Sequence, residues 1–332
     1  MEILKFALIS LLVTSGLYAT AQRLELLVKT GTTSIRGLSV VDDKVVWVSG
    51  SKGMVGRSED GGKTWNWNQV KGFEKRDFRD IEAFNKNTAV ILAIAEPGNI
   101  LKTTDGGKTW KTVFSDSTKG VFIDAFSFLA NGDGIAIGDP IDGKAYLIKT
   151  DNYGSSWSRQ VDAPALDNGE GCFASSGTNI VLSNDGSYYF VTGGLSSRLH
   201  NGKSASRLPL VQGKESTGAN SIAISGDNIV IVGGDFAHDS IDTDNSVLIK
   251  TGKSPVMSKL VTPPHGYRSC VEFINAKDLI TCGTSGVDFS RDGGKSWNLI
   301  SKEGFHVCQK AKKGKAVFLA GGNGRIAKVV FD

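Results

Sequence analysis

The stretch Ser58-Glu59-Asp60-Gly61-Gly62-Lys63-Thr64-Trp65 decides the fold, because close copies of it recur along the chain. Similar stretches occupy residues 103–110, 150–157 and 290–297, and each copy ends on a tryptophan. These tryptophans are separated by 45, 47 and 140 residues. The last step is about three times the others, so two degenerate copies are expected between them, and Gly-Lys-Ser occurs at 202–204 and at 252–254. A unit of this length repeated along a chain indicates a propeller or solenoid.

Each copy of this stretch is expected to form the same tight turn. The aspartate carboxylate accepts backbone N–H groups within the turn, and glycine supplies a backbone conformation that other residues resist. The tryptophan is expected to bury its ring between neighbouring sheets. The residues assigned to this structural role are Asp60, Trp65, Asp105, Trp110, Trp157, Asp292 and Trp297.

A second repeat gives the number of units. Seven short apolar runs end in glycine-rich turns, which is the pattern of β-strands; they lie at 45–50, 89–94, 134–138, 189–193, 229–233, 279–283 and 316–321. The sequence therefore predicts an all-β, seven-bladed β-propeller with four strands in each blade. The last unit has only three strands, and the strand Leu24–Val28 is predicted to complete it and close the ring.

The first residues have the layout of a secretory signal. Lys5 precedes an apolar run at 6–17, and an Ala-x-Ala site ends at Ala21. The run is shorter than the roughly 20 residues of a membrane-spanning helix. We therefore expect a signal peptide at 1–21, cleaved after Ala21, and a single propeller domain at 22–332. The mature protein is expected to be periplasmic or extracellular and monomeric, without membrane insertion.

Composition excludes several classes of function. The formal net charge is +4 and is spread along the chain, so no basic stripe for nucleic acid is present. The four cysteines and four histidines show neither Cys-x-x-Cys nor His-x-x-x-His spacing, and we expect no metal and no cofactor. Cys270 and Cys282 flank a predicted hairpin turn at equal distance, so a disulfide between them is geometrically allowed and is left open.

The repeated motif Ser/Thr-x-Asp-x-Gly-x-Thr/Ser-Trp resembles the Asp-box of the bacterial neuraminidase repeat. From Arg23 to Asp332 the chain resembles the Asp-box propellers grouped with photosystem II assembly and stability factors, and more distantly sialidases and the sortilin ectodomain. The resemblance implies a secreted or lumenal scaffold without known catalysis. It also implies that ligands bind on the face opposite the Asp-box turns.

Candidate binding residues come from aligning the starts of the seven innermost strands. The aligned residues are Arg36, Arg79, Ile123, Phe173, Ser221, Arg268 and His306. In a closed ring Arg268, His306, Arg36 and Arg79 are expected to form a cationic arc at the channel mouth, with Asp80, Asp124 and Tyr267 beside it. The arc either binds a small anion or an acidic protein segment, or its arginines pair with Asp80 and Asp124 and close the channel.

The function predicted from these residues is a secreted, non-catalytic scaffold with no catalytic residues. The alternative is a sialidase-like glycoside hydrolase acting on an anionic sugar, but no Arg-Ile-Pro motif is present, and only Tyr267 and Glu170 offer a nucleophile and its partner. An oxidoreductase is a remote alternative, suggested by the labels of related proteins. Residues 322–327 imitate a dinucleotide fingerprint, but five strand-like residues are all that follow them, where the motif requires a helix.

Overall fold

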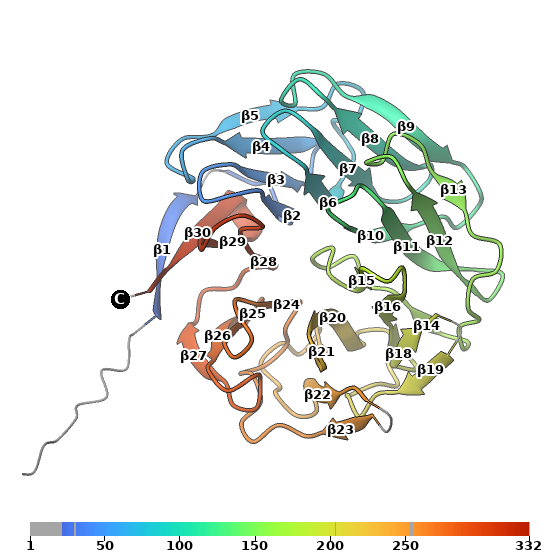
Figure 1. The fold of residues 1–332 in the computed structure, drawn as a ribbon, viewed down its shortest axis with the longest axis vertical. Helices are drawn as coiled ribbons and strands as arrows, with labels where there is room; N and C mark the ends of the chain where they lie inside the picture. Colours follow the sequence, from blue (N-terminus) through green and yellow to red (C-terminus); the bar gives the residue numbers. More distant parts are fainter. Residues whose placement is uncertain (1–21, 30, 203, 253–254, 332) are drawn as a thin grey trace, which may run out of the picture.

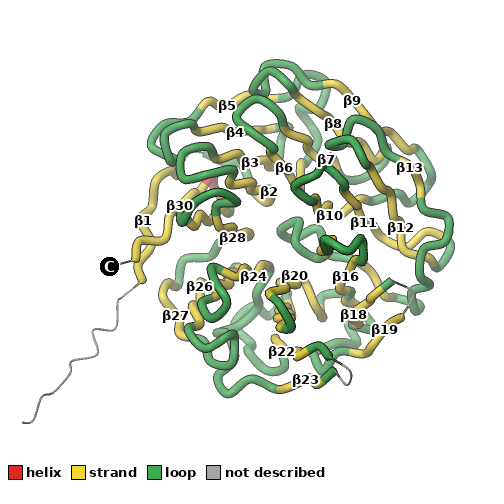
Figure 2. The backbone as a smooth tube through the Cα atoms, viewed as in Figure 1, coloured by secondary structure: helices red, strands yellow, loops and turns green. Residues whose placement is uncertain are grey.

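The computed structural model describes residues 22–29, 31–202, 204–252 and 255–331. Seven antiparallel sheets stand around a central axis and form a closed ring (Figure 1). Within the described residues the one helical element is the short turn η1 (Gly322–Gly324), and the remainder is strand and loop (Figure 2). The predicted all-β, seven-bladed propeller is confirmed. The predicted signal peptide at 1–21 lies outside the described residues.

The first three blades follow the predicted pattern of four consecutive strands. Their apolar residues alternate or run continuously because each blade is covered on both faces by its neighbours. Blade 1 contains β2 (Ile35–Val40), β3 (Val46–Gly50), β4 (Met54–Ser58) and β5 (Asn66–Gln69). Blade 2 contains β6 (Phe78–Ala83), β7 (Ala89–Ala93), β8 (Gly98–Thr103) and β9 (Lys111–Asp116). Blade 3 contains β10 (Ile123–Phe128), β11 (Gly134–Ile141), β12 (Lys144–Thr150) and β13 (Ser158–Arg159).

Blades 4 to 6 include the degenerate repeats. Blade 4 contains β15 (Ile180–Leu182), β16 (Tyr188–Val191), β18 (Arg198–Asn201) and β19 (Ser204–Arg207). Blade 5 contains β20 (Thr217–Ser225), β21 (Asn228–Asp235), β22 (Ser246–Lys250) and β23 (Val256–Ser258), and the short strands β14 (Glu170–Gly171) and β17 (Gly193–Gly194) extend its sheet beyond β20. Blade 6 contains β24 (Cys270–Phe273), β25 (Leu279–Gly283), β26 (Gly286–Ser290) and β27 (Asn298–Ser301).

Blade 7 closes the ring with strands from both ends of the chain. It contains β28 (Val307–Lys310), β29 (Val317–Ala320), β30 (Arg325–Phe331) and β1 (Gln22–Lys29). Strand β1 pairs antiparallel with β30, from Gln22 opposite Phe331 to Lys29 opposite Arg325. Figure 1 shows β1 beside β30 on the outside of the ring. The predicted closure by the N-terminal strand is therefore confirmed.

The repeated turns are held by their own side chains. The Asp60 carboxylate accepts the backbone N–H of Thr64 at 2.9 Å and the hydroxyl of Thr64 at 2.6 Å, and these bonds lower its pKa to about 2. Asp105 and Thr109 repeat this arrangement in blade 2. In the third copy Asn152, which the sequence alignment did not single out, takes the position of the aspartate and accepts the N–H groups of two following serines.

The tryptophan of each turn packs against the blade that precedes it in the ring. Trp297 is 1 % exposed and contacts Val230 and other residues of blade 5. Trp65, Trp110 and Trp157 are half-buried, and the ring of Trp110 meets Trp47 edge-on with centroids 6.4 Å apart. The expectation that all four rings are buried between blades thus holds fully for Trp297 and in part for the others.

The hairpin of blade 6 has the register that the sequence predicts. Cys270 on β24 lies directly opposite Cys282 on β25. All four cysteines are free thiols in this structure, and the sulfur atoms of Cys270 and Cys308, on neighbouring blades, are 3.6 Å apart.

Candidate functional site

Four innermost strands carry a β-bulge at the same place, near their first residue. The pairing shifts between Ile35 and Gly37, between Phe78 and Asp80, between Ile123 and Ala125, and between Ala219 and Ser221. A bulge leaves one residue out of the ladder and redirects its side chain. The residues at the bulges are Arg36, Arg79, Asp124 and Asn220.

Blades 6 and 7 place Ser269 and His306 at the equivalent position. The backbone N–H of Ser269 donates to Cys282 and that of His306 to Ala320, each on the adjacent strand of its own blade. Arg268 is one residue earlier, where blades 1 and 7 have Ile35 and Phe305, and all three side chains are fully buried. The structure therefore separates Arg268 from the arc in which the sequence alignment placed it.

Blade 4 departs further from the alignment. Its innermost strand is β15, whereas the alignment used residues 172–174 for this strand. Residues 172–175 instead form a loop beyond β14, because the short pairing of β14 with β17 holds this segment against blade 5. The repeat is degenerate in this blade, so the sequence did not indicate where its innermost strand begins.

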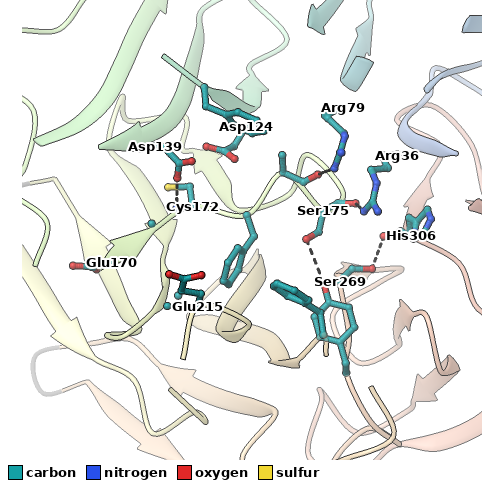
Figure 3. A pocket seen from close by; sticks show the side chains of 18 of the residues that line it. Arg36, Arg79, Asp124, Asp139, Glu170, Cys172, Ser175, Glu215, Ser269 and His306 are labelled. Atoms are coloured by element: carbon teal, nitrogen blue, oxygen red, sulfur yellow. Dashed lines mark hydrogen bonds between the residues drawn. The ribbon is translucent and has the colours of Figure 1, made fainter. Parts of the chain in front are cut away.

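A cavity of about 800 Å³ opens where these elements meet, and Figure 3 shows its lining. Of the predicted site residues, Arg36, Arg79, Asp124, Tyr267 and His306 line it, whereas Asp80 and Arg268 are not among its lining residues. The loop at 172–175 forms part of its wall, and three phenylalanines add apolar surface: Phe122, Phe173 and Phe236. Asp139, on β11, and Glu215, in a loop, also line the cavity and were not among the predicted site residues, because both lie outside the aligned innermost strands.

The two arginines of the cavity are positioned by backbone carbonyls. Arg36 donates to the carbonyl oxygen of Ser175 at 3.0 Å, and Arg79 donates to that of Ala174 at 3.1 Å. Arg79 also lies 3.5 Å from a carboxylate oxygen of Asp77. Burial and the neighbouring Arg79 lower the pKa of Arg36 to about 10, so the Arg36 guanidinium is still charged at neutral pH. Neither forms an ion pair with Asp80 or Asp124 in the described structure.

His306 lies beside the arginines without sharing their charge. Burial and then the charges of Arg36 and Arg79 lower its pKa to about 3. The imidazole is therefore neutral at pH 7, and the cationic part of the cavity consists of Arg36 and Arg79.

Asp80 and Arg268 have partners away from the cavity. Asp80 accepts the backbone N–H groups of Ile81 at 2.8 Å and of Phe126 at 2.9 Å, which ties blade 2 to blade 3, and burial raises its pKa. Arg268 is fully buried and donates from Nε to Asp288 at 2.7 Å. Through these contacts Asp80 and Arg268 stabilise the fold.

The groups considered for catalysis have other partners. The hydroxyl of Tyr267 donates to the amide oxygen of Asn220 at 2.9 Å, whereas Glu170 is bound by Arg198, His200 and Thr192. The glycines at 322–324 lead directly into strand β30, where a dinucleotide fingerprint requires a helix. In the part of the chain that the structure describes, no three metal-ligating side chains gather into a possible metal site. None of the helices formed there has the length and apolar character of a membrane span.

The closed ring of seven blades, with similar turns around Asp60, Asp105 and Asp292, defines a β-propeller of the bacterial neuraminidase repeat type. The family model described as photosynthesis system II assembly factor YCF48 matches residues 20–328, and the chain belongs to this family.

Individual relatives are distant in sequence. The photosystem II assembly lipoprotein Ycf48 of Synechococcus sp. (strain CC9902) is 24 % identical over 152 residues, which cover 46 % of this chain and 44 % of the relative, so the match spans less than half of that protein. Among solved structures, YCF48 bound to D1 peptide is 17 % identical, with a TM-score of 0.66 and coverage of 95 % of this chain and 97 % of the other. YCF48 from Cyanidioschyzon merolae has a TM-score of 0.65 at 15 % identity, covering 92 % and 98 %.

A structure of different function has nearly the same fold. A catalytically inactive virginiamycin B lyase from Staphylococcus aureus with quinupristin is 15 % identical, with a TM-score of 0.62 and coverage of 94 % and 100 %. At these identities the likeness of solved structures shows the fold alone, and function has to be argued from the site.

Proposed function

We propose that this propeller is a secreted, non-catalytic scaffold that binds a carboxylate-bearing segment of a partner protein in the channel-mouth cavity. Arg36 and Arg79 would hold the carboxylate, and the phenylalanines of the lining would hold apolar side chains beside it. Residues 1–21 favour a location in the periplasm or outside the cell.

One observation carries this proposal: two adjacent arginines line the cavity, and among the described residues Asp77, 3.5 Å from Arg79, is the one carboxylate that forms an ion pair with either of them. Within the described residues, the Arg36 side chain makes a single hydrogen bond, to the carbonyl oxygen of Ser175, and no ion pair. A guanidinium has five N–H donors, so a single hydrogen bond leaves most of the donors of Arg36 available to a ligand. Bringing two like charges together costs free energy, and a bound carboxylate offsets that cost through charge-assisted hydrogen bonds.

The apolar part of the lining favours a peptide over a small inorganic anion. Phe173 and Phe236 meet edge-on with centroids 5.8 Å apart, and Phe236 remains 49 % exposed at the cavity. Phe173 is half-buried, and a partly exposed aromatic pair beside fixed arginines is typical of sites that anchor a segment through one apolar and one charged side chain. A related propeller of the family was solved bound to D1 peptide, which supports a peptide as the ligand.

The proposal is tested with an array of labelled peptides of about ten residues, each carrying glutamates and a phenylalanine, with binding measured by fluorescence anisotropy. Replacing Arg36 and Arg79 together by Gln should weaken binding at least tenfold, because each shielded contact to arginine contributes about 1.5–3 kcal/mol. Added salt should weaken binding to the wild type, since the cavity is open to solvent. The matched control is Arg207→Gln with Lys111→Gln, which removes two exposed charges outside the cavity.

Two results would contradict the proposal. One is equal binding of every peptide by the wild type and by the Arg36→Gln, Arg79→Gln protein. The other is an equally large loss in the control protein, which would show a general attraction of anions to a cationic surface.

A further inference from the structure

The carboxylate of Asp124 is the most unusual polar group in the cavity wall. Asp124 has 0 % relative exposure, and within the described residues neither carboxylate oxygen has a hydrogen-bond partner. The backbone N–H of Asp139 faces it but donates to the carbonyl oxygen of Phe122 at 2.9 Å. A buried polar group without a partner costs free energy, so the fold retains this carboxylate at a cost.

Asp124 shares its side of the cavity with a second carboxylate. Asp139, at the end of β11, accepts the backbone N–H of Cys172 at 3.0 Å with one oxygen. Figure 3 shows both carboxylates on one side and Arg36 and Arg79 on the opposite side. Glu215 adds an exposed carboxylate to the lining. We call Asp124 and Asp139 the acidic wall and Arg36 and Arg79 the basic wall.

The basic side chains near the acidic wall have other partners. Arg198 and His200 contact Glu170, a third carboxylate that lines the same cavity. Arg79 exerts a long-range attraction on Asp124, while its own contacts are Ala174 and Asp77. Burial, followed by the charge of Asp139, raises the pKa of Asp124 well above its usual value. A cation bound beside Asp124 would lower this pKa again and so favour the ionised form of its carboxyl group.

We propose that the acidic wall is a subsite for a cationic side chain, a lysine ammonium or an arginine guanidinium, carried by the same segment whose carboxylate binds the basic wall. This inference rests on the proposed function and makes it more specific: the ligand carries both charges. An ammonium has three donors and suits two neighbouring carboxylates. Mg²⁺ or Ca²⁺ fits less well, because each requires six or more oxygen ligands.

The acidic wall would also discriminate between ligands. A ligand with negative groups alone leaves the buried carboxyl of Asp124 without a partner, whereas a ligand that also carries a cation supplies that partner. Specificity then comes from the polar group that the wrong ligand leaves unpaired as well as from attraction of the right one.

The experiment compares two sets of amidated, acetylated peptides on an array. The first set carries glutamates and a phenylalanine, and the second adds one lysine at each position in turn, with acetyl-lysine as the uncharged control. Lysine at one or a few positions should strengthen binding to the wild type at least tenfold, although it lowers the negative charge that the arginines attract. Asp124→Asn should abolish this gain and leave binding of the lysine-free peptides unchanged or stronger. Glu25→Gln, an equal charge change on the exposed part of β1, should keep the gain.

Folding is checked on the same proteins. Asp124→Asn should melt at the wild-type temperature or above it, because the substitution removes a buried carboxyl without a partner. If this protein fails to fold, Asp139→Asn takes its place, with the same expected loss of the lysine effect.

The outcomes separate the two proposals. If acidic peptides bind through Arg36 and Arg79 but lysine gives no gain, or gives the same gain in Asp124→Asn and Asp139→Asn, the subsite is overturned and the proposed function stands. If no peptide of either set distinguishes the wild type from the Arg36→Gln, Arg79→Gln protein, the proposed function is overturned and the subsite with it.

Discussion

Arg268 in blade 6 and Arg36 in blade 1 occupy almost the same place in their blades and have opposite environments. Arg268 is fully buried, and its donors reach Asp288, the carbonyl oxygen of Tyr267 and the hydroxyl of Ser285. Arg36 faces the cavity with one carbonyl contact and a second arginine as its neighbour. The difference follows from one residue of register, since Arg36 is at the bulge of blade 1 and Arg268 comes one residue before Ser269, the equivalent position of blade 6. One residue of register therefore decides whether an arginine is buried in the fold or lines the cavity.

The largest effect is expected from breaking the buried pair. Arg268→Met should destabilise the protein by about 3–5 kcal/mol, because it leaves the carboxylate of Asp288 buried without its guanidinium. Chemical denaturation followed by tryptophan fluorescence measures this change. Binding of the acidic peptides by the fraction that folds should be unchanged.

A second substitution sharpens this test. Arg268→Met combined with Asp288→Leu should recover most of the lost stability, since a buried ion pair replaced by apolar residues is often neutral. His265 loses its contact with Asp288 in this protein, but its side chain is 47 % exposed and reaches water. A double variant as unstable as the single one would show that Arg268 acts through something other than its pair with Asp288.

The sequence predicted what depends on local, repeated interactions. The turn around Asp60, the pairing of β1 with β30 and the opposition of Cys270 and Cys282 follow from spacing along the chain, and the structure has all three.

The site depends on what spacing does not encode. The alignment was displaced by one residue at Asp124, at Asn220 and at Ser269, and a one-residue shift sends a side chain to the other face. The loop at 172–175, whose carbonyl groups hold both arginines, belongs to the blade with the most degenerate repeat. The neutral state of His306 could not be predicted either, because it arises from burial beside two charges brought together by the fold.

An intermediate effect is expected from His306 and appears only in acid. Its folded-state pKa of about 3 lies below the ordinary value of 6.5, so the unfolded chain takes up a proton that the folded protein does not. Stability is therefore complete above pH 6.5 and is lost as the pH falls toward 3. His306→Gln should lose less stability than the wild type between pH 6.5 and 4, as measured by thermal melting at each pH.

The buried carboxyls act in the opposite direction and are present in both proteins. Burial raises the pKa of Asp80 and of Asp124, so their contribution to stability grows as the pH falls toward 4. The contribution of the carboxyls cancels when the stability of His306→Gln is subtracted from that of the wild type at each pH. What remains is the contribution of His306. Parallel melting curves across this pH range would mean that His306 is protonated beside the arginines, which restores the larger cationic arc.

The smallest effect on stability is expected at Arg36. Its size tests whether Arg36, unlike Arg268, contributes little to the stability of the fold. Arg36→Met removes one hydrogen bond to Ser175, which contributes about 1 kcal/mol, but it also relieves the burial of a charge and its repulsion by Arg79. The net change should therefore stay within about 1 kcal/mol.

Each single substitution at Arg36 or Arg79 relieves the same repulsion, so the double variant should be less stable than the sum of the two singles predicts. High salt screens the repulsion and should make Arg36→Met more destabilising. If Arg36→Met instead costs as much as Arg268→Met, both arginines support the fold, and the unneutralised charge from which a ligand was inferred does not exist.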